Sequence, residues 1–361
     1  MTGNTVKTHD CPKFERDILE WKLPGSVLDA LLKDRSSGKN ILWATEDYVR
    51  RGSGFGAEDE MRSEQVTDHL RPPIRPRVDK NATEQRRRVV QRAEIFTPSW
   101  ICNKQNNLVD AAWFGWKKPE SSPFNEELAV PDLEPGWAWR STPGKVVFPK
   151  GKTWQDYVES PRLEVACGEA PYLASRYDAV SGCMIPIADR IGFLDRKLRI
   201  VTENIVPGDS LSWLEGAKRA LQSVYGFDWQ GDNVLLAREN VLATVIETYN
   251  AVFHGEESSV PRFGEDLLLE LAGIASWNIW QMDGIQFVVP GSCKPKVSTQ
   301  YLLDGTSVKV YSPCPGCFRK GHARHTGIYC KIMDWKTGSK VEFASLVGGG
   351  RLKELMGGEP E

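Results

Sequence analysis

The chain has 361 residues, of which 40% are hydrophobic and 26% charged, an ordinary soluble composition with room for one large domain or two smaller ones. Its formal net charge is only −2, yet the charges are unevenly distributed. No run of about 18 uncharged apolar residues occurs, which argues against a membrane span and a membrane partner. Residues 1–17 lack the basic-then-apolar pattern of a signal peptide, so we expect a cytoplasmic protein.

The first part of the chain is predicted to be helical. Residues 14–21 and 26–32 have helical patterns that Pro24-Gly25 separates. The glycine-rich residues 51–56 lack a strand–turn–helix context, so they favour a flexible loop over a phosphate-binding loop. Residues 71–78 are rich in proline and are expected to be extended.

A cluster of basic residues follows, with eight lysines and arginines between Arg71 and Arg92. Such clustering can form an electrostatic footprint for a phosphate backbone even on a nearly neutral protein. The alternative is a solvated, partly flexible basic segment. On the first interpretation, the candidate DNA-binding residues are Arg86, Arg87 and Arg88.

Residues 81–113 are predicted to form two helices with a break at Thr97-Pro98. A threonine before a proline suits a helix N-cap followed by the first helical position. Residues 117–152 are rich in proline, glycine and acidic residues and are expected to be a surface excursion.

The segment from Glu164 to Leu173 is the most informative of the chain. It has the pattern of the end of a buried strand, a turn of small residues (Ala166, Cys167, Gly168) and the start of a helix. Because small side chains let the backbone approach a ligand closely, this turn is a candidate binding site.

The second half of the chain alternates between helical and strand patterns. Helices are expected around residues 211–224, 233–253 and 267–274, with strands at 224–228 and 279–288. This alternation predicts an α/β fold with a mainly parallel sheet covered on both faces.

The pattern acidic-x-Ala-Cys-Gly at 164–168 resembles the cofactor-binding signature of the amino-type DNA methyltransferases. This resemblance implies S-adenosylmethionine as the cofactor, bound at Glu164, Ala166, Cys167 and Gly168.

Three further segments resemble this family in the family's own order. Tyr225-Gly-Phe-Asp228 is similar to the second motif and makes Asp228 the candidate for the ribose hydroxyls, the alternative being an ordinary capping or surface carboxylate. Asp283 is similar to the adenine-binding acid of the third motif, or it is a turn former before a glycine. Phe96-Thr97-Pro98 resembles the segment that packs against the methionine end.

One departure from the family is the spacing of the acidic residues. Glu164 and Asp228 lie 64 positions apart, whereas a simple βαβ unit places the second acid about 20 residues on. Residues 176–210 are therefore expected to be an insertion.

A second departure is the missing (Asn/Asp/Ser)-Pro-Pro-aromatic turn, which in this family orients the target amine of a flipped base. Two explanations remain: a partner polypeptide supplies the turn, or an altered turn forms at Asp334-Trp335. We favour the partner, as in the modification subunits of restriction systems. This resemblance also implies DNA and a restriction nuclease as partners.

Four cysteines crowd into the last quarter of the chain. Cys314-Pro-Gly-Cys317 has the spacing of a zinc knuckle, and we expect Cys293 and Cys330 to complete a structural zinc site, with His322 and His325 also in reach. A redox couple or two buried thiols are the alternatives.

The sequence thus predicts a Rossmann-like S-adenosylmethionine-dependent methyltransferase fold with an N-terminal helical and basic region (1–92), a methyltransferase core (93–290) and a zinc-knuckle tail (291–361). The expected function is methyl transfer to an exocyclic amine of DNA, at adenine N6. The alternative is a non-catalytic DNA-binding module of a restriction or defence system on a degenerate methyltransferase fold.

Overall fold

We describe a computed structural model of the chain, covering residues 12, 23–67, 74–92, 94–116, 122–128, 137–255, 258, 260–318 and 324–347. Its centre is a parallel sheet of three strands, in the order β3 (Arg162–Val165), β4 (Val224–Asp228) and β5 (Ile279–Gln281). A mixed α/β fold is therefore confirmed. The described residues form small sheets only, and the methyltransferase fold stays a prediction.

Helices pack against one face of this sheet. They are α6 (Phe193–Asn204), α7 (Ser210–Gln222), α8 (Gly231–His254) and α9 (Glu265–Asn278). Every residue of α8 from Gly231 to Asn250 is buried, which is typical of a helix surrounded by protein on all sides.

The C-terminal elements cover the opposite face. They are β8 (Lys331–Asp334), its antiparallel partner β9 (Ser339–Glu342) and α11 (Phe343–Val347). Phe227 and Trp280 of the sheet pack against Phe343, with ring centroids 5.8 and 5.2 Å away. The two faces of the sheet therefore border two separate apolar clusters.

Residues 23–67 pack into the main hydrophobic core and do not form a separate layer. Helix α1 (Gly25–Leu32) contributes Leu28 and Leu31 to it, and the short helices η2 (Val49–Arg51) and α2 (Ser63–Val66) follow. The side chain of Gln281 donates to and accepts from the backbone of Leu42, at 2.9 and 2.8 Å. The helix expected at 14–21 lies outside the described residues.

The basic region forms η3 (Arg77–Asp79) and α3 (Ala82–Arg92), and α4 (Ser99–Phe114) follows. The two helices and their break agree with the sequence, although Pro98 occupies the N-cap position expected for Thr97. Buried Arg196 of α6 donates to Asp110 at 2.6 Å and so ties α4 to the sheet-covering layer.

Residues 176–210 add a helix to the connection between β3 and β4, as an insertion would, but much of this segment is buried and does not lie on the surface. They contain η4 (Ile187–Asp189) and α6, whose Leu194, Leu198 and Val201 are fully buried. This helix and α7 form the connection between β3 and β4. The segment expected as a surface excursion contains β1 (Asn125–Glu127) and β2 (Trp139–Ser141), which pair antiparallel, and α5 (Trp154–Val158) lies beyond it.

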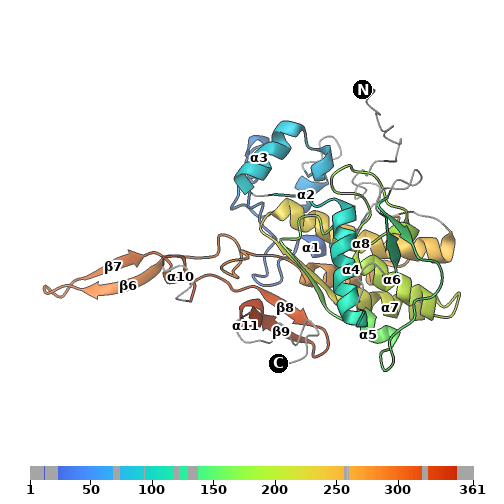
Figure 1. Cartoon of the computed structure of the whole chain (residues 1–361). Helices are drawn as coiled ribbons and strands as arrows, with labels where there is room; N and C mark the ends of the chain where they lie inside the picture. The colour runs from blue at the N-terminus through green and yellow to red at the C-terminus, as the bar shows by residue number, and fades with distance from the viewer. Residues whose placement is uncertain are drawn as a thin grey trace.

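A β-hairpin extends away from this body (Figure 1). Its strands are β6 (Lys296–Tyr301) and β7 (Ser307–Ser312), and the short α10 (Pro315–Phe318) follows. We call residues 294–312 the arm.

Among the described residues, no helix is long and apolar enough to cross a membrane. Cys183 is disulfide-bonded.

Candidate cofactor pocket and candidate metal centre

A pocket of about 410 Å³ lies at the carboxyl ends of β3 and β4. Ligands of open α/β sheets bind at this edge, because the loops that follow parallel strands converge there. Three segments line the pocket: Arg92 with residues 94–97, residues 164–168 with Pro171 and Tyr172, and Asp228, Trp229, Gln230 and Asn233.

The turn after β3 has an unusual backbone. Ala166, Gly168 and Ala170 have φ angles of +52°, +54° and +63°, in the left-handed region that alanine rarely adopts. Such strain gathers at functional sites, where the surrounding structure enforces it. A Cβ atom at Gly168 would lie 3.4 Å from the ring of Phe96, so any side chain here would point at the pocket's aromatic wall.

Asp228 ends β4 at the floor of the pocket. Its carboxylate accepts from the backbone N–H groups of Gly168 at 3.0 Å and Gln230 at 2.9 Å. Burial raises the pKa of Asp228 to about 6, although these two hydrogen bonds oppose the shift. The acid therefore connects the two loops that form the pocket.

Four buried oxygen atoms of the lining residues have no hydrogen-bond partner within the protein. They are Glu94 Oε1, Glu164 Oε2, Gln230 Oε1 and Asn233 Oδ1. Burying a polar group without a partner costs about 1–3 kcal/mol. The amide oxygens of Gln230 and Asn233 are acceptors, and the carboxyl oxygens of Glu94 and Glu164 accept when ionised, so a ligand with N–H and O–H donors suits the pocket.

Glu164 is one of the three acids of this pocket, with Glu94 and Asp228. Burial raises its pKa well above the usual value, and nearby Asp228 raises it further. Its Oε1 accepts from the N–H of Tyr172 at 3.5 Å, while its Oε2 is the unpaired atom described above.

The structure brings together Phe96, Thr97, Glu164, Ala166, Cys167, Gly168 and Asp228, which are seven of the nine predicted cofactor residues. Pro98 caps α4 just outside the lining. Asp283 is not in the pocket: its Oδ1 accepts from Ile285 N and Gln286 N, so it forms a turn. The adenine-binding expectation for Asp283 is therefore corrected.

Several pocket residues were missed from the sequence. Tyr172 lies within the segment 164–173 and Glu94 lies two residues before Phe96, but neither was assigned to the site. Gln230 and Asn233 lie outside every motif, and Trp229 could have been noticed only as the neighbour of Asp228. The indole of Trp229 is 40% exposed and its N–H donates to Ala44 O at 3.1 Å.

Asp334 and Trp335 do not line this pocket. The carboxylate of Asp334 accepts from Lys336 N and Thr337 Oγ1 in the turn between β8 and β9. The indole N–H of Trp335 donates to Asn278 Oδ1 at 2.7 Å. Both side chains are thus engaged in the turn and its packing.

The predicted DNA-binding arginines differ in their surroundings. Arg88 is 2% exposed and pairs with Asp47 and Asp232, each at 2.9 Å, and with Glu94. Its assignment as a DNA contact is therefore corrected. Arg87 pairs with Asp47 at 2.7 Å and is partly exposed, and Arg86 is exposed.

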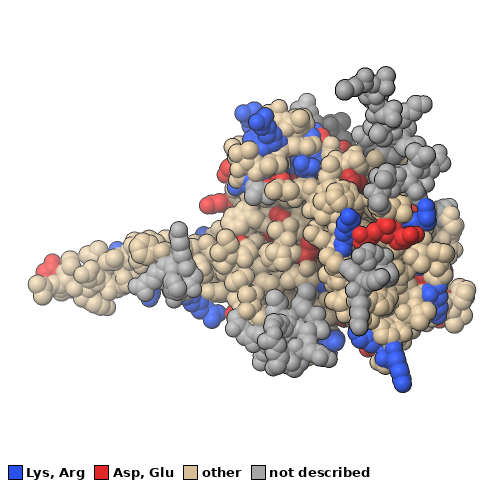
Figure 2. Space-filling model, in the orientation of Figure 1, with Lys and Arg blue, Asp and Glu red and all other residues tan. Residues whose placement is uncertain are grey.

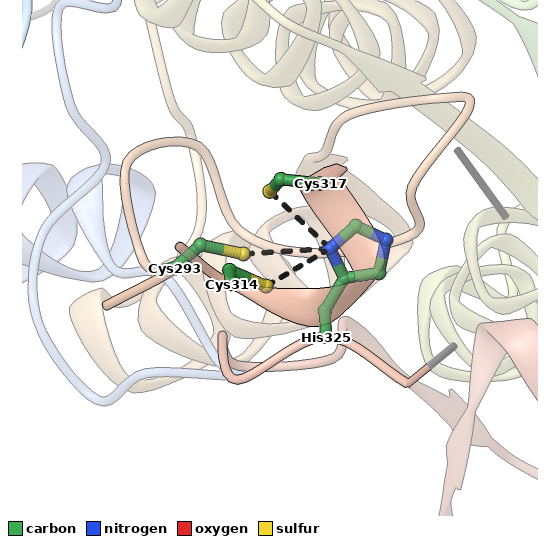
Figure 3. Close-up of side chains that lie close together, drawn as sticks. All are labelled: Cys293, Cys314, Cys317 and His325. Atoms are coloured by element: carbon green, nitrogen blue, oxygen red, sulfur yellow. Dashed lines mark hydrogen bonds between the residues drawn. The ribbon is translucent and has the colours of Figure 1, made fainter. Parts of the chain in front are cut away.

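The second site is a cluster of three thiols and one imidazole, shown in Figure 3: Cys293, Cys314, Cys317 and His325. The three sulfur atoms lie 3.5, 3.7 and 3.6 Å from the same His325 Nδ1. One ring nitrogen cannot share a single proton with three thiols. Zn–S bonds of about 2.3 Å and a Zn–N bond of about 2.0 Å at tetrahedral angles place sulfur and nitrogen roughly 3.6 Å apart.

Two glycines make room for this cluster. A Cβ atom at Gly316 would lie 2.6 Å from the His325 ring, and one at Gly327 would lie 2.8 Å from Cys293 Sγ. The backbone N–H of Thr326 donates to Cys314 Sγ at 3.3 Å, as expected for a thiolate ligand.

The expected fourth ligand is corrected from Cys330 to His325. Cys330 is fully buried in the apolar cluster between the sheet and α11, and its thiol donates to Gln281 O at 3.4 Å. His322 lies outside the described residues. The cluster can thus hold a metal ion as a Cys₃His set.

Comparisons of this chain with protein-family models, with curated proteins and with solved structures found no match.

Proposed function

We propose that the pocket at β3 and β4 binds S-adenosylmethionine and that the chain is the cofactor-binding subunit of a DNA methyltransferase acting on adenine N6. The observation that carries this proposal is the pocket itself. It combines a glycine turn of strained backbone, an acid at the end of the neighbouring strand and four unpaired acceptors.

The cofactor's chemistry matches this lining. S-adenosylmethionine supplies a methyl group on a sulfonium, and it carries hydroxyl, ammonium and amino donors. A carboxylate offers about four lone-pair sites, so Asp228 has capacity for a ribose hydroxyl beside its two backbone bonds and the one from Asn233 Nδ2 at 3.5 Å. Phe96 and Trp229 provide apolar surface for the methionine chain and the adenine ring, while Glu94 and Glu164 suit the remaining donors.

The partner polypeptide stays a prediction, and two observations favour it. Asp334 and Trp335 are committed to a turn outside the pocket. The N–H of Arg162 donates to Ser223 O and so points toward β4. Because successive N–H groups of a strand point to opposite sides, those of Leu163 and Val165 point away from β4, toward the free edge of β3. Val165 is 67% exposed there, beside the pocket, where an added strand could bring a catalytic turn.

We also propose that the Cys₃His cluster holds a structural zinc ion. Four protein ligands close the coordination sphere, whereas a catalytic zinc keeps one position for water or substrate. The redox alternative is less favoured because His325 lies equally close to all three thiols.

Isothermal titration of the purified chain with S-adenosylmethionine tests the cofactor proposal. We expect binding that Gly168→Arg and Asp228→Ala each abolish, because one fills the pocket and the other removes its acid. Asp283→Ala is the matched control and should bind as the wild type does. A tritiated cofactor should label no DNA without the partner.

Absence of binding in the wild-type chain would contradict the proposal and favour the non-catalytic DNA-binding module. Equal affinity of the wild type and Asp228→Ala would place the cofactor elsewhere. A companion restriction nuclease stays a prediction.

A further inference from the structure

The arm is the part of the molecule that the cofactor pocket does not explain. Its strands form six residue pairs, from Lys296 opposite Ser312 to Tyr301 opposite Ser307, and all of these residues are exposed. At about 3.3 Å per residue, the paired part is roughly 20 Å long. Figure 1 shows it extending from the body, so neither of its faces packs on the core.

The arm's side chains suit a negatively charged polymer. Neither strand contains Asp or Glu, and Lys294, Lys296 and Lys309 are exposed. The one acid of the arm is Asp304, whose Oδ1 accepts from the backbone and hydroxyl of Thr306. The arm is thus net positive on a chain of net charge −2, and its acidic tip is visible in Figure 2.

Both faces of the ribbon carry hydrogen-bonding groups between apolar ones. Thr299 pairs with Lys309 on one face, beside Tyr311 and Tyr301, and Ser298 lies opposite Val310 on the other. Lysine, serine, threonine and tyrosine side chains supply many of the contacts that proteins make with phosphates. This mixed pattern differs from the continuous apolar face expected of a protein–protein core.

The tip and the base of the arm are also distinctive. Leu303 is fully exposed at the tip, beside Tyr301 at 79%. At the base, Cys293 precedes β6 and Cys314 follows β7, so the Cys₃His cluster closes the two ends of the hairpin. An isolated hairpin is only marginally stable in water, and a metal at the base would fix its direction.

We propose that the arm binds duplex DNA as a two-stranded ribbon, with its lysines on the phosphates and its tip against the bases. The major groove is about 12 Å wide and admits such a ribbon. Apolar side chains at the tip of an arm can wedge between base steps. The inference shares with the proposed function only its DNA substrate, and it does not require the pocket to bind cofactor.

Fluorescence anisotropy of a labelled 30-base-pair duplex, titrated with the full zinc-loaded chain at several salt concentrations, tests this inference. The double variant Lys296→Gln/Lys309→Gln should bind at least tenfold more weakly at low salt. Its slope of log affinity against log salt should shrink by about 2, because two phosphate contacts are lost. Leu303→Ser should weaken binding without changing that slope.

Lys145→Gln/Lys150→Gln removes the same charge from an exposed loop and is the matched control, expected to bind as the wild type does. Zinc content and melting temperature establish that each variant is folded. The inference is overturned if the wild type binds no duplex, or if the arm variant equals the control in affinity and salt slope. A change of oligomeric state in Leu303→Ser, with DNA binding intact, would instead make the arm a protein contact. Cofactor titration of the same variants keeps this outcome separate from that of the pocket.

Discussion

Asp228 shows how a single buried acid connects the fold to its proposed ligand. Its pKa is raised because burial disfavours the charged carboxylate, yet the proposed ribose contact requires that carboxylate as an acceptor. The raised pKa therefore makes both stability and binding depend on pH in the range just above the ordinary pKa of an aspartate.

Cofactor affinity should fall up to tenfold per pH unit below pH 6 and be constant above it, because the bound carboxylate must first lose its proton. The stability contributed by this group should decrease as the pH rises from about 4 to about 6, since the folded protein there holds the proton more tightly than the unfolded chain. Thermal unfolding of the wild type and Asp228→Asn across pH 4–7 measures the second effect. An unchanged pH dependence in Asp228→Asn would contradict it.

At the same scale, the sequence predicted Glu164, Asp228 and the small residues of the pocket but not its full lining. Cys167, Gly168 and Asp228 belong to local patterns, so their places could be predicted. Glu94 lies two residues before Phe96 and Asn233 five residues after Asp228, but neither belongs to a pattern that indicates ligand binding, so their place in the lining was not predicted. Asp283 was wrongly assigned to the pocket, because a turn-forming aspartate can have the same local sequence as a ligand-binding one.

At the scale of elements, some ligands of the metal cluster could be predicted from the sequence and one could not. The Cys-x-x-Cys pair and Cys293 were predictable from spacing and thiol chemistry. The choice between Cys330 and His325 was not, because it depends on where β8 begins: Cys330 immediately precedes that strand and enters the core, while His325 remains in the loop near Gly316.

Cys317→Ser should lose bound zinc, and Gly316→Val should do the same because its side chain would collide with His325. Cys102→Ser, a change at a buried thiol far from the cluster in sequence, should keep one zinc ion per chain. Metal analysis by mass spectrometry measures both. A protease should cut the arm faster after the zinc ion has been removed with a chelator. Equal cleavage with and without metal would show that the metal does not stabilise the hairpin.

At the scale of the whole molecule, the alternation of helices and strands was enough to predict an α/β class. The burial of α6 in the connection between β3 and β4 was not predicted, because this buried helix carries polar and charged residues. Lys197 and Arg196 are both buried there, with Arg196 paired to Asp110. Buried charges with distant partners look like surface residues in a sequence.

Arg88 is another buried charge that looks like a surface residue in the sequence, because its partner Asp232 lies 144 positions away. Arg88→Met should lower the free energy of unfolding by about 3–5 kcal/mol, because it removes the buried cation shared by Asp47, Glu94 and Asp232 and leaves Asp232 with Lys80 as its remaining ion-pair partner. Exposed Arg86→Met should change it by less than about 0.5 kcal/mol. Urea unfolding measures both, and equal effects would show that the Arg88 pairs are not what anchors α3.

The two halves of the chain meet along the outer side of β5. Leu42 bonds with Gln281, Lys331 N donates to Ser36 Oγ at 2.8 Å, and Arg238 donates to the carbonyl of Leu31. Gly231 has no room for a side chain, since a Cβ atom there would lie 1.9 Å from Leu42 O. During synthesis, residues 31–42 can therefore make these contacts only after residues 231–331 have left the ribosome. A nascent chain that stops before α9 would leave α1 without the helix on which it packs, so the apolar side of α1 stays exposed until α9 has been made.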